Sequence, residues 1–171
     1  MLLETVQLSR SFGGVVAVRD VDFEVREGLI TGLIGPNGAG KTTLFNNISG
    51  LDNPTSGKVI FQGKDITNVS AHKICRLGIA RTFQNIRLFK ELSVLENVMV
   101  GLHFKTGKGP TKGRFGAAIK SFIWAGSEYD AMYEIALKWL KFFSLDPLQD
   151  ELAKNLPYGH QRELEIARAL A

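Results

Sequence analysis

The sequence has few of the features of a secreted, disulfide-bonded or membrane-spanning protein. Its single cysteine, Cys75, cannot form an internal disulfide and has no second ligand at metal-site spacing, which predicts a reducing compartment such as the cytosol. No run of about 18 apolar residues occurs, and residues 1–5 carry no basic region leading into an apolar one. Neither a membrane span nor a secretion signal is expected, so any membrane role would come through a partner.

Acidic residues are lacking between positions 97 and 127, where five basic residues occur: Lys105, Lys108, Lys112, Arg114 and Lys120. This pattern predicts a basic, glycine-rich loop followed by an apolar patch from Phe115 to Trp124. The patch would lie near lipid headgroups or a membrane partner, or simply in solvent. The whole chain has a formal net charge of only +4, so we expect no nucleic-acid partner. With 44% hydrophobic and 22% charged residues, it has the composition of a globular protein.

The first half of the chain has the pattern of an α/β fold. Residues 2–8 and 15–25 read as a half-buried hairpin, because apolar and charged residues alternate in the second run. Residues 29–34 are almost uncharged and do not alternate, which predicts a strand covered on both faces. A helix is expected over 42–49 and a further strand over 58–62.

Later segments are mainly helical. Ser70 is expected to cap a short helix that ends before Gly78, and residues 79–83 read as a short strand. Helices are predicted from Ser93 to about position 103 and over 127–143, where apolar residues recur on one helical face. The run that ends in Asp146-Pro147 reads as the exit from the second helix.

A phosphate-binding loop follows the predicted strand at 29–34 and opens the predicted helix. It matches the full pattern G-x-x-x-x-G-K-[ST] with Gly35, Pro36, Asn37, Gly38, Ala39, Gly40, Lys41 and Thr42. Glycines let successive backbone N–H groups point at phosphate oxygens, and the helix adds its positive N-terminal end. Lys41 would reach the β- and γ-phosphates of ATP, Thr42 would bind Mg²⁺, and Thr43 would hydrogen-bond the α-phosphate.

Other segments narrow the kind of nucleotide-binding protein. The run Leu156, Pro157, Tyr158, Gly159, His160, Gln161 and Arg162, with the helix ending in Ala-Arg-Ala-Leu, resembles the signature motif of ABC ATPases. Thr82-Phe83-Gln84 resembles the Q-loop of that family, in which Gln84 would sense the metal and the attacking water. Phe12 stands where an aromatic side chain of the family stacks on adenine.

The resemblance implies an α/β fold of the ABC type, with a mixed sheet core, an antiparallel β subdomain and a helical subdomain. It implies a nucleotide-binding core over 1–86, a helical subdomain over 87–155, and the signature motif and helix over 156–171. Its signature residues would contact the ATP of a second ATP-binding subunit, identical or paralogous. Thr42 and Gln84 would be the metal ligands of the chain.

The segment from Arg81 to Val98 is similar to ATP-binding subunits of branched-chain amino-acid importers. This likeness implies transmembrane permease partners and a peripheral location at the cytoplasmic face of the membrane. The signature differs from the usual one because Pro157 replaces a serine, which removes a hydroxyl and a backbone N–H. The signature helix is expected to begin near His160.

In the family, the Walker B strand and the catalytic glutamate follow the signature helix, whereas the printed sequence ends at Ala171. We therefore expect a fragment, incomplete at the C-terminus, that binds MgATP weakly and hydrolyses it negligibly on its own. Two alternatives stay open. One is a small P-loop kinase with Asp146 as its acid and Arg76, Arg81 and Arg87 in a lid; the other is a nonhydrolytic ABC-like module, which Pro157 favours.

Overall fold

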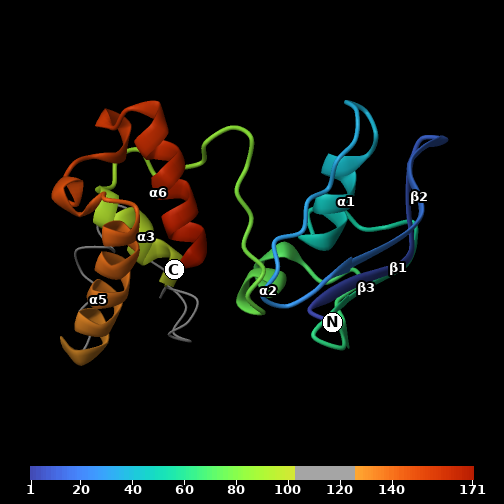
Figure 1. Ribbon diagram of the computed structural model, residues 1–171, viewed down its shortest axis with the longest axis horizontal. Helices are drawn as coiled ribbons and strands as arrows, with labels where there is room; N and C mark the ends of the chain where they lie inside the picture. The colour runs from blue at the N-terminus through green and yellow to red at the C-terminus, as the bar shows by residue number, and fades with distance from the viewer. Residues whose placement is uncertain (103–125) are drawn as a thin grey trace. The chain divides into compact units, whose positions relative to one another are not determined.

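The structure, a computed structural model, describes residues 1–102 and 126–171, with only the backbone at 126–128. The chain divides into two compact units, Met1–Ile79 and Ala80–Ala171, and each is described by itself (Figure 1). The basic loop and the apolar patch predicted between Lys105 and Trp124 lie outside the described residues. No helix among the described residues is long and apolar enough to cross a membrane.

The first unit contains a four-stranded antiparallel sheet with the order β2-β1-β3-β4. The strands are β1 (Leu3–Phe12), β2 (Val15–Val25), β3 (Ser56–Phe61) and β4 (Lys64–Asp65). Leu3 pairs with Val25 at one end of the β1–β2 hairpin, and Phe12 pairs with Val15 beside the turn. The predicted hairpin and third strand are therefore confirmed, although β1 continues to Phe12 instead of ending near Leu8.

Helix α1 (Lys41–Ile48) packs against this sheet, and α2 (Ala71–Arg76) contributes Ile74 to the same core (Figure 1). Leu44 and Ile48 of α1 are buried with side chains from the sheet, from the residue after β4 and from α2: Leu3, Leu8, Val59, Phe61, Ile66 and Ile74. Both helices were expected. Ser70 occupies the N-cap position of α2, but its side chain makes no capping hydrogen bond.

Two predicted strands are wrong. Residues 29–34 and 79–83 have no regular secondary structure. A strand needs a neighbour to satisfy its backbone N–H and C=O groups, and no described strand pairs with either segment. As a result Leu29, Ile30 and Ile34 are exposed, although their apolar character predicts burial.

The second unit is helical. Its helices are α3 (Val94–Leu102), α5 (Gly126–Phe142) and α6 (Tyr158–Leu170), with short 3-10 helices η1 (Asp146–Leu148) and η2 (Ala153–Asn155). The two predicted helices are confirmed as α3 and α5. The core contains Val94, Val98, Leu102, Met132, Ala136, Leu140, Leu145, Leu164 and Ala167.

Local sequence sets the ends of these helices. Ser93 and Glu96 form a capping box before α3: Glu96 N–H donates to the Ser93 hydroxyl at 3.1 Å, and Ser93 N–H donates to the Glu96 carboxylate at 2.8 Å. Helix α5 ends before Ser144, which has a positive φ of 56°, and Asp146 opens η1. The predicted helix exit is thus confirmed, and Asp146 does not end a strand as the acid of the kinase alternative would.

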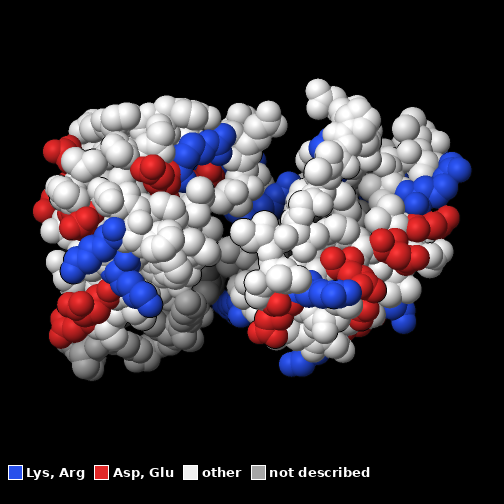
Figure 2. Space-filling model, in the orientation of Figure 1, with Lys and Arg blue, Asp and Glu red and all other residues white. Residues whose placement is uncertain are grey.

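Charged side chains of both signs are interspersed on the face of each unit that Figure 2 shows. This face offers no large surface of one sign, which agrees with the small net charge of +4. The charges on this face therefore do not point to a functional surface, and the candidate site is built from local geometry.

Candidate functional site

The phosphate loop connects the irregular segment at 29–34 directly to α1. Gly40 is the N-cap of α1, with a φ of 84°, and makes no side-chain cap. A Cβ atom at Gly40 would lie 2.3 Å from the carbonyl oxygen of Ala17 on β2, so a side chain does not fit there. The first turn of α1 also carries no acidic residue. This helix N-terminus is therefore open to an anion, since nothing in its own sequence neutralises it.

The Lys41 ammonium lies over the same loop. It donates to the carbonyl oxygens of Gly35 and Pro36, each at 2.6 Å. Both acceptors are neutral, and no acidic side chain of the described residues forms an ion pair with it. Its positive charge is therefore available to a phosphate. Thr42 is exposed in the first turn of α1, and Thr43 is half-buried.

Phe12 lies at the end of β1, in the same unit as the loop, and is 43% exposed. The guanidinium of Arg10 lies 4.3 Å from its ring centroid, and Arg10 also forms an ion pair with Asp52 at 2.9 Å. One ring face is thus covered by Arg10, and the exposed part of the ring is where a base would stack.

The signature residues form the beginning of α6. Pro157 is its N-cap and Tyr158 its first residue, so the predicted start near His160 is two residues too late. Proline favours this early start because its fixed φ suits the chain just before a helix and its missing N–H costs no intrahelical hydrogen bond there. Tyr158 and Gly159 are exposed, whereas Leu156 is buried.

Two other signature residues have local partners. Gln161 donates from its side-chain amide to the Leu156 carbonyl at 2.8 Å. His160 Nδ1 lies 2.8 Å from the carboxylate of Glu163. Gln161 therefore fixes the turn into α6, while His160 pairs with a neighbour on the same helix, as expected for a residue at a helix start.

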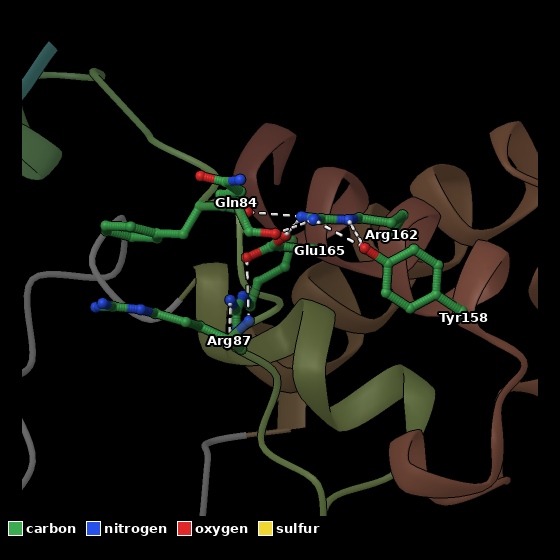
Figure 3. Close-up of polar contacts among 7 residues, drawn as sticks. Gln84, Arg87, Tyr158, Arg162 and Glu165 are labelled. Atoms are coloured by element: carbon green, nitrogen blue, oxygen red, sulfur yellow. Dashed lines mark hydrogen bonds and ion pairs between the residues drawn. The ribbon is translucent and has the colours of Figure 1, made fainter. Parts of the chain in front are cut away.

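Gln84 lies in a stretch of the second unit that has no regular structure, and its side chain is exposed. Its backbone is bound to α6. Arg162 donates from Nη1 to the Phe83 carbonyl at 2.6 Å and from Nη2 to the Gln84 carbonyl. Glu165 accepts the Arg87 N–H at 3.2 Å (Figure 3).

Arg168 of α6 also holds this stretch, because it donates to the Arg87 carbonyl at 2.5 Å, and the three α6 side chains differ in their surroundings. Hydrogen bonds to the Tyr158 hydroxyl raise the pKa of the Arg162 guanidinium, and Glu165 adds to the effect. Burial lowers the pKa of Arg168, opposed by the charge of Glu165. Glu165 itself is only 2% exposed and pairs with Arg162 at 3.1 Å. The sequence points to Arg162 only as the last residue of the signature run and does not single out Glu165 or Arg168, although charges at positions 162, 165 and 168 recur at the spacing of one helix face.

Phe83, next to Gln84, lies between two cations. The guanidinium of Arg87 is 4.0 Å from its ring centroid and that of Arg81 is 5.1 Å away. Burial and the neighbouring charge of Arg87 lower the pKa of Arg81. Arg81 and Arg87 thus pack on an aromatic ring, which differs from the phosphate lid that the kinase alternative needs.

The predicted site residues are divided between the two units. The first unit holds Phe12 and the loop from Gly35 to Thr43; the second holds Gln84 and the signature residues. In the described part of the chain no group of three or more His, Cys, Asp or Glu side chains could hold a metal ion.

Comparisons with known proteins agree with this geometry. Relatives include the high-affinity branched-chain amino acid transport ATP-binding proteins BraF of Pseudomonas aeruginosa, 42% identical over 169 residues, and LivG of Escherichia coli K12, 39% identical over 171 residues. Each alignment covers 99% of this chain and 64% of the relative, so the chain spans less than two thirds of their length.

Solved structures give the same result for the fold. The ADP conformation of MJ1267, an ATP-binding cassette of an ABC transporter, matches with a TM-score of 0.78 and 36% identity, over 99% of this chain and 64% of that one. The model of the ABC transporter family matches residues 18–171. The chain therefore belongs to the ABC transporter family and has the fold of its nucleotide-binding domain.

Proposed function

We propose that the protein containing this chain is the ATP-binding subunit of an ABC importer and powers the uptake of branched-chain amino acids. The observation that carries the proposal is the loop from Gly35 to Lys41, which presents an uncapped helix N-terminus and an ammonium that pairs with no acidic side chain of the described residues. The cargo is proposed from the relatives, whose names assign them to branched-chain amino-acid transport.

Each site residue has a role in this proposal. Loop amides enclose the β- and γ-phosphates with Lys41, Thr42 binds Mg²⁺, Thr43 meets the α-phosphate, and Phe12 stacks on the adenine. Gln84 binds the metal and orients the attacking water, which ATP hydrolysis requires. The first turn of α6, from Pro157 to Gln161, contacts the γ-phosphate held by a second ATP-binding subunit.

Assembly follows from the same roles. One solved relative, the ATP-binding cassette MJ0796 bound to ADP and Pi, is dimeric; it is 27% identical to this chain with a TM-score of 0.75. We infer a head-to-tail pair in which each subunit's loop faces the other's signature. The pair would bind transmembrane permease subunits at the cytoplasmic face of the membrane, as a peripheral component.

MgATP binding by the full-length protein tests the proposal. Lys41→Ala should weaken MgATP binding at least about tenfold, since a charge-assisted bond to phosphate contributes about 1.5–3 kcal/mol. Lys64→Ala is the matched control, because Lys64 is an exposed lysine of β4 in the same unit. Equal affinities of the wild type and Lys41→Ala, measured by calorimetry, would overturn the assignment of the loop.

A nonhydrolytic module is the second candidate, since Pro157 offers neither a hydroxyl nor an N–H to a partner's phosphate. ATPase measurements on the full-length protein with its permease separate the two. Turnover that Lys41→Ala abolishes supports the importer subunit, whereas tight MgATP binding without turnover supports the module.

A further inference from the structure

The stretch that carries Gln84 depends on α6 for its backbone hydrogen bonds. Because it has no regular structure, its N–H and C=O groups need partners from elsewhere. Four of them find partners on α6: the carbonyls of Phe83 and Gln84 with Arg162, the Arg87 N–H with Glu165, and the Arg87 carbonyl with Arg168 at 2.5 Å. One helix therefore determines the path of this stretch.

Arg162 is suited to this role because of its shape. Two nitrogens of one guanidinium donate to two consecutive carbonyls, those of Phe83 and Gln84. Glu165 accepts from the same guanidinium, while Tyr158 receives its remaining donors at 3.1 and 3.3 Å. A lysine at this position has a single donor group without the planar fork and cannot hold both carbonyls in the same way.

The Gln84 side chain itself is not part of these contacts. Figure 3 shows its amide directed away from Arg162, whereas its backbone carbonyl faces the guanidinium. The contacts thus fix the main chain at Gln84 and leave the side-chain amide exposed. A group that orients water or metal gains precision when its backbone is held by a rigid element.

We propose that Arg162 and Glu165 are positioning residues that tie the Gln84 backbone to the signature helix, so that Gln84 follows any movement of that helix. The inference rests on the proposed function, in which Gln84 serves hydrolysis and the start of α6 contacts a partner's ATP. Arg162 lies one helical turn after Tyr158, the first residue of α6. Engagement of the signature with phosphate would therefore reach Gln84 through Arg162, the side chain that binds its carbonyl.

The test compares ATPase kinetics of the full-length protein with those of Arg162→Met, alone and in a Gln84→Ala background. Arg162→Met should lower kcat about tenfold, with MgATP affinity within about twofold, because the phosphate loop is unchanged. In the Gln84→Ala background the same substitution should lower kcat by less than about twofold, since both changes affect one function. Arg162→Lys keeps the charge but loses the fork, and should restore only part of the activity.

Lys154→Met is the matched control, because Lys154 also bonds to the segment between Gln84 and α3, through an ion pair with Glu91 at 2.7 Å. That pair is exposed and does not touch the Gln84 backbone, so kcat should stay within about twofold of the wild type. Hydrogen exchange supplies a second readout: the Arg87 amide should exchange faster in Glu165→Ala, which removes its acceptor.

The outcomes separate the two proposals. Wild-type protein that neither binds nor hydrolyses MgATP would overturn the proposed function, and the positioning role with it. If the wild type is active, two results would overturn the positioning role alone. One is an unchanged kcat in Arg162→Met. The other is a loss of kcat from Arg162→Met that is equally large in the wild-type and Gln84→Ala backgrounds. A loss of kcat that disappears once activity is expressed per folded molecule would show a merely structural role and would also overturn it.

Discussion

Asn97 organises the chain before α3 by hydrogen bonds of a single side chain. It is fully buried, and its Oδ1 accepts the Phe89 N–H at 2.9 Å. Its Nδ2 donates to the carbonyls of Phe89 at 3.0 Å and Ser93 at 2.9 Å. A buried amide of this kind satisfies backbone groups that would otherwise lack partners in a turn without regular structure.

Replacement of Asn97 by alanine should therefore cost about 2–3 kcal/mol of unfolding free energy, since it leaves buried backbone groups without partners. Asn155→Ala is the control, because Asn155 is exposed in the same unit, and should change stability by less than about 0.5 kcal/mol. Urea unfolding of the full-length protein measures both. Similar midpoints for the two variants would contradict the role given to Asn97.

At the scale of elements, helices were easier to predict from the sequence than strands. The apolar positions of α5, including Met132, Ala136 and Leu140, predict a helix, and these three residues are indeed buried. The backbone N–H and C=O groups of a helix bond to each other within the helix, so a local apolar pattern is enough to predict it. Residues 29–34 have an equally clear apolar pattern but form no strand, because a strand depends on partners that are remote in sequence.

The candidate site also has a local part that the sequence predicts and a long-range part that it does not. The loop from Gly35 to Thr42 is a local motif, and its glycines and lysine stand in an unbroken run that the sequence shows directly. The bonds from Arg162 to Phe83 and Gln84 join residues nearly 80 positions apart. Spacing along α6 predicts that Arg162, Glu165 and Arg168 share a face, but it does not predict what that face contacts.

Close packing of α3 on α6 depends on Gly101. A Cβ atom at this position would lie 2.3 Å from the carbonyl oxygen of Arg168. Gly101→Ala should therefore push the helices apart and cost about 1–3 kcal/mol of unfolding free energy, despite the better helix propensity of alanine. Thermal unfolding of the full-length protein measures the loss.

Gly159 provides the control for Gly101, because it is also helical and a Cβ atom there meets nothing within 4 Å. Gly159→Ala should leave the melting temperature unchanged or slightly higher, as expected from helix propensity alone. If both variants melt at the wild-type temperature, the two helices do not need the glycine contact.

At the scale of the whole molecule, the proposed function assigns nucleotide binding to two surfaces that belong to different units. The loop from Gly35 to Lys41 lies in Met1–Ile79 and the signature turn lies in Ala80–Ala171. In the proposed function the first surface binds the subunit's own MgATP, whereas the second binds the ATP of another subunit. The two surfaces should therefore respond differently to the concentration of ATP-binding subunits.

Hydrogen exchange of the full-length protein with MgATP measures this difference. Amides 37–43 should be protected at every protein concentration, since one subunit is enough to bind nucleotide there. Amides 158–161 should gain protection only as the concentration of ATP-binding subunits rises, because their phosphate comes from a partner. Lys41→Ala should remove both effects. Protection of 158–161 that is independent of concentration would contradict the head-to-tail pair, while the assignment of the loop would stand on the protection of 37–43.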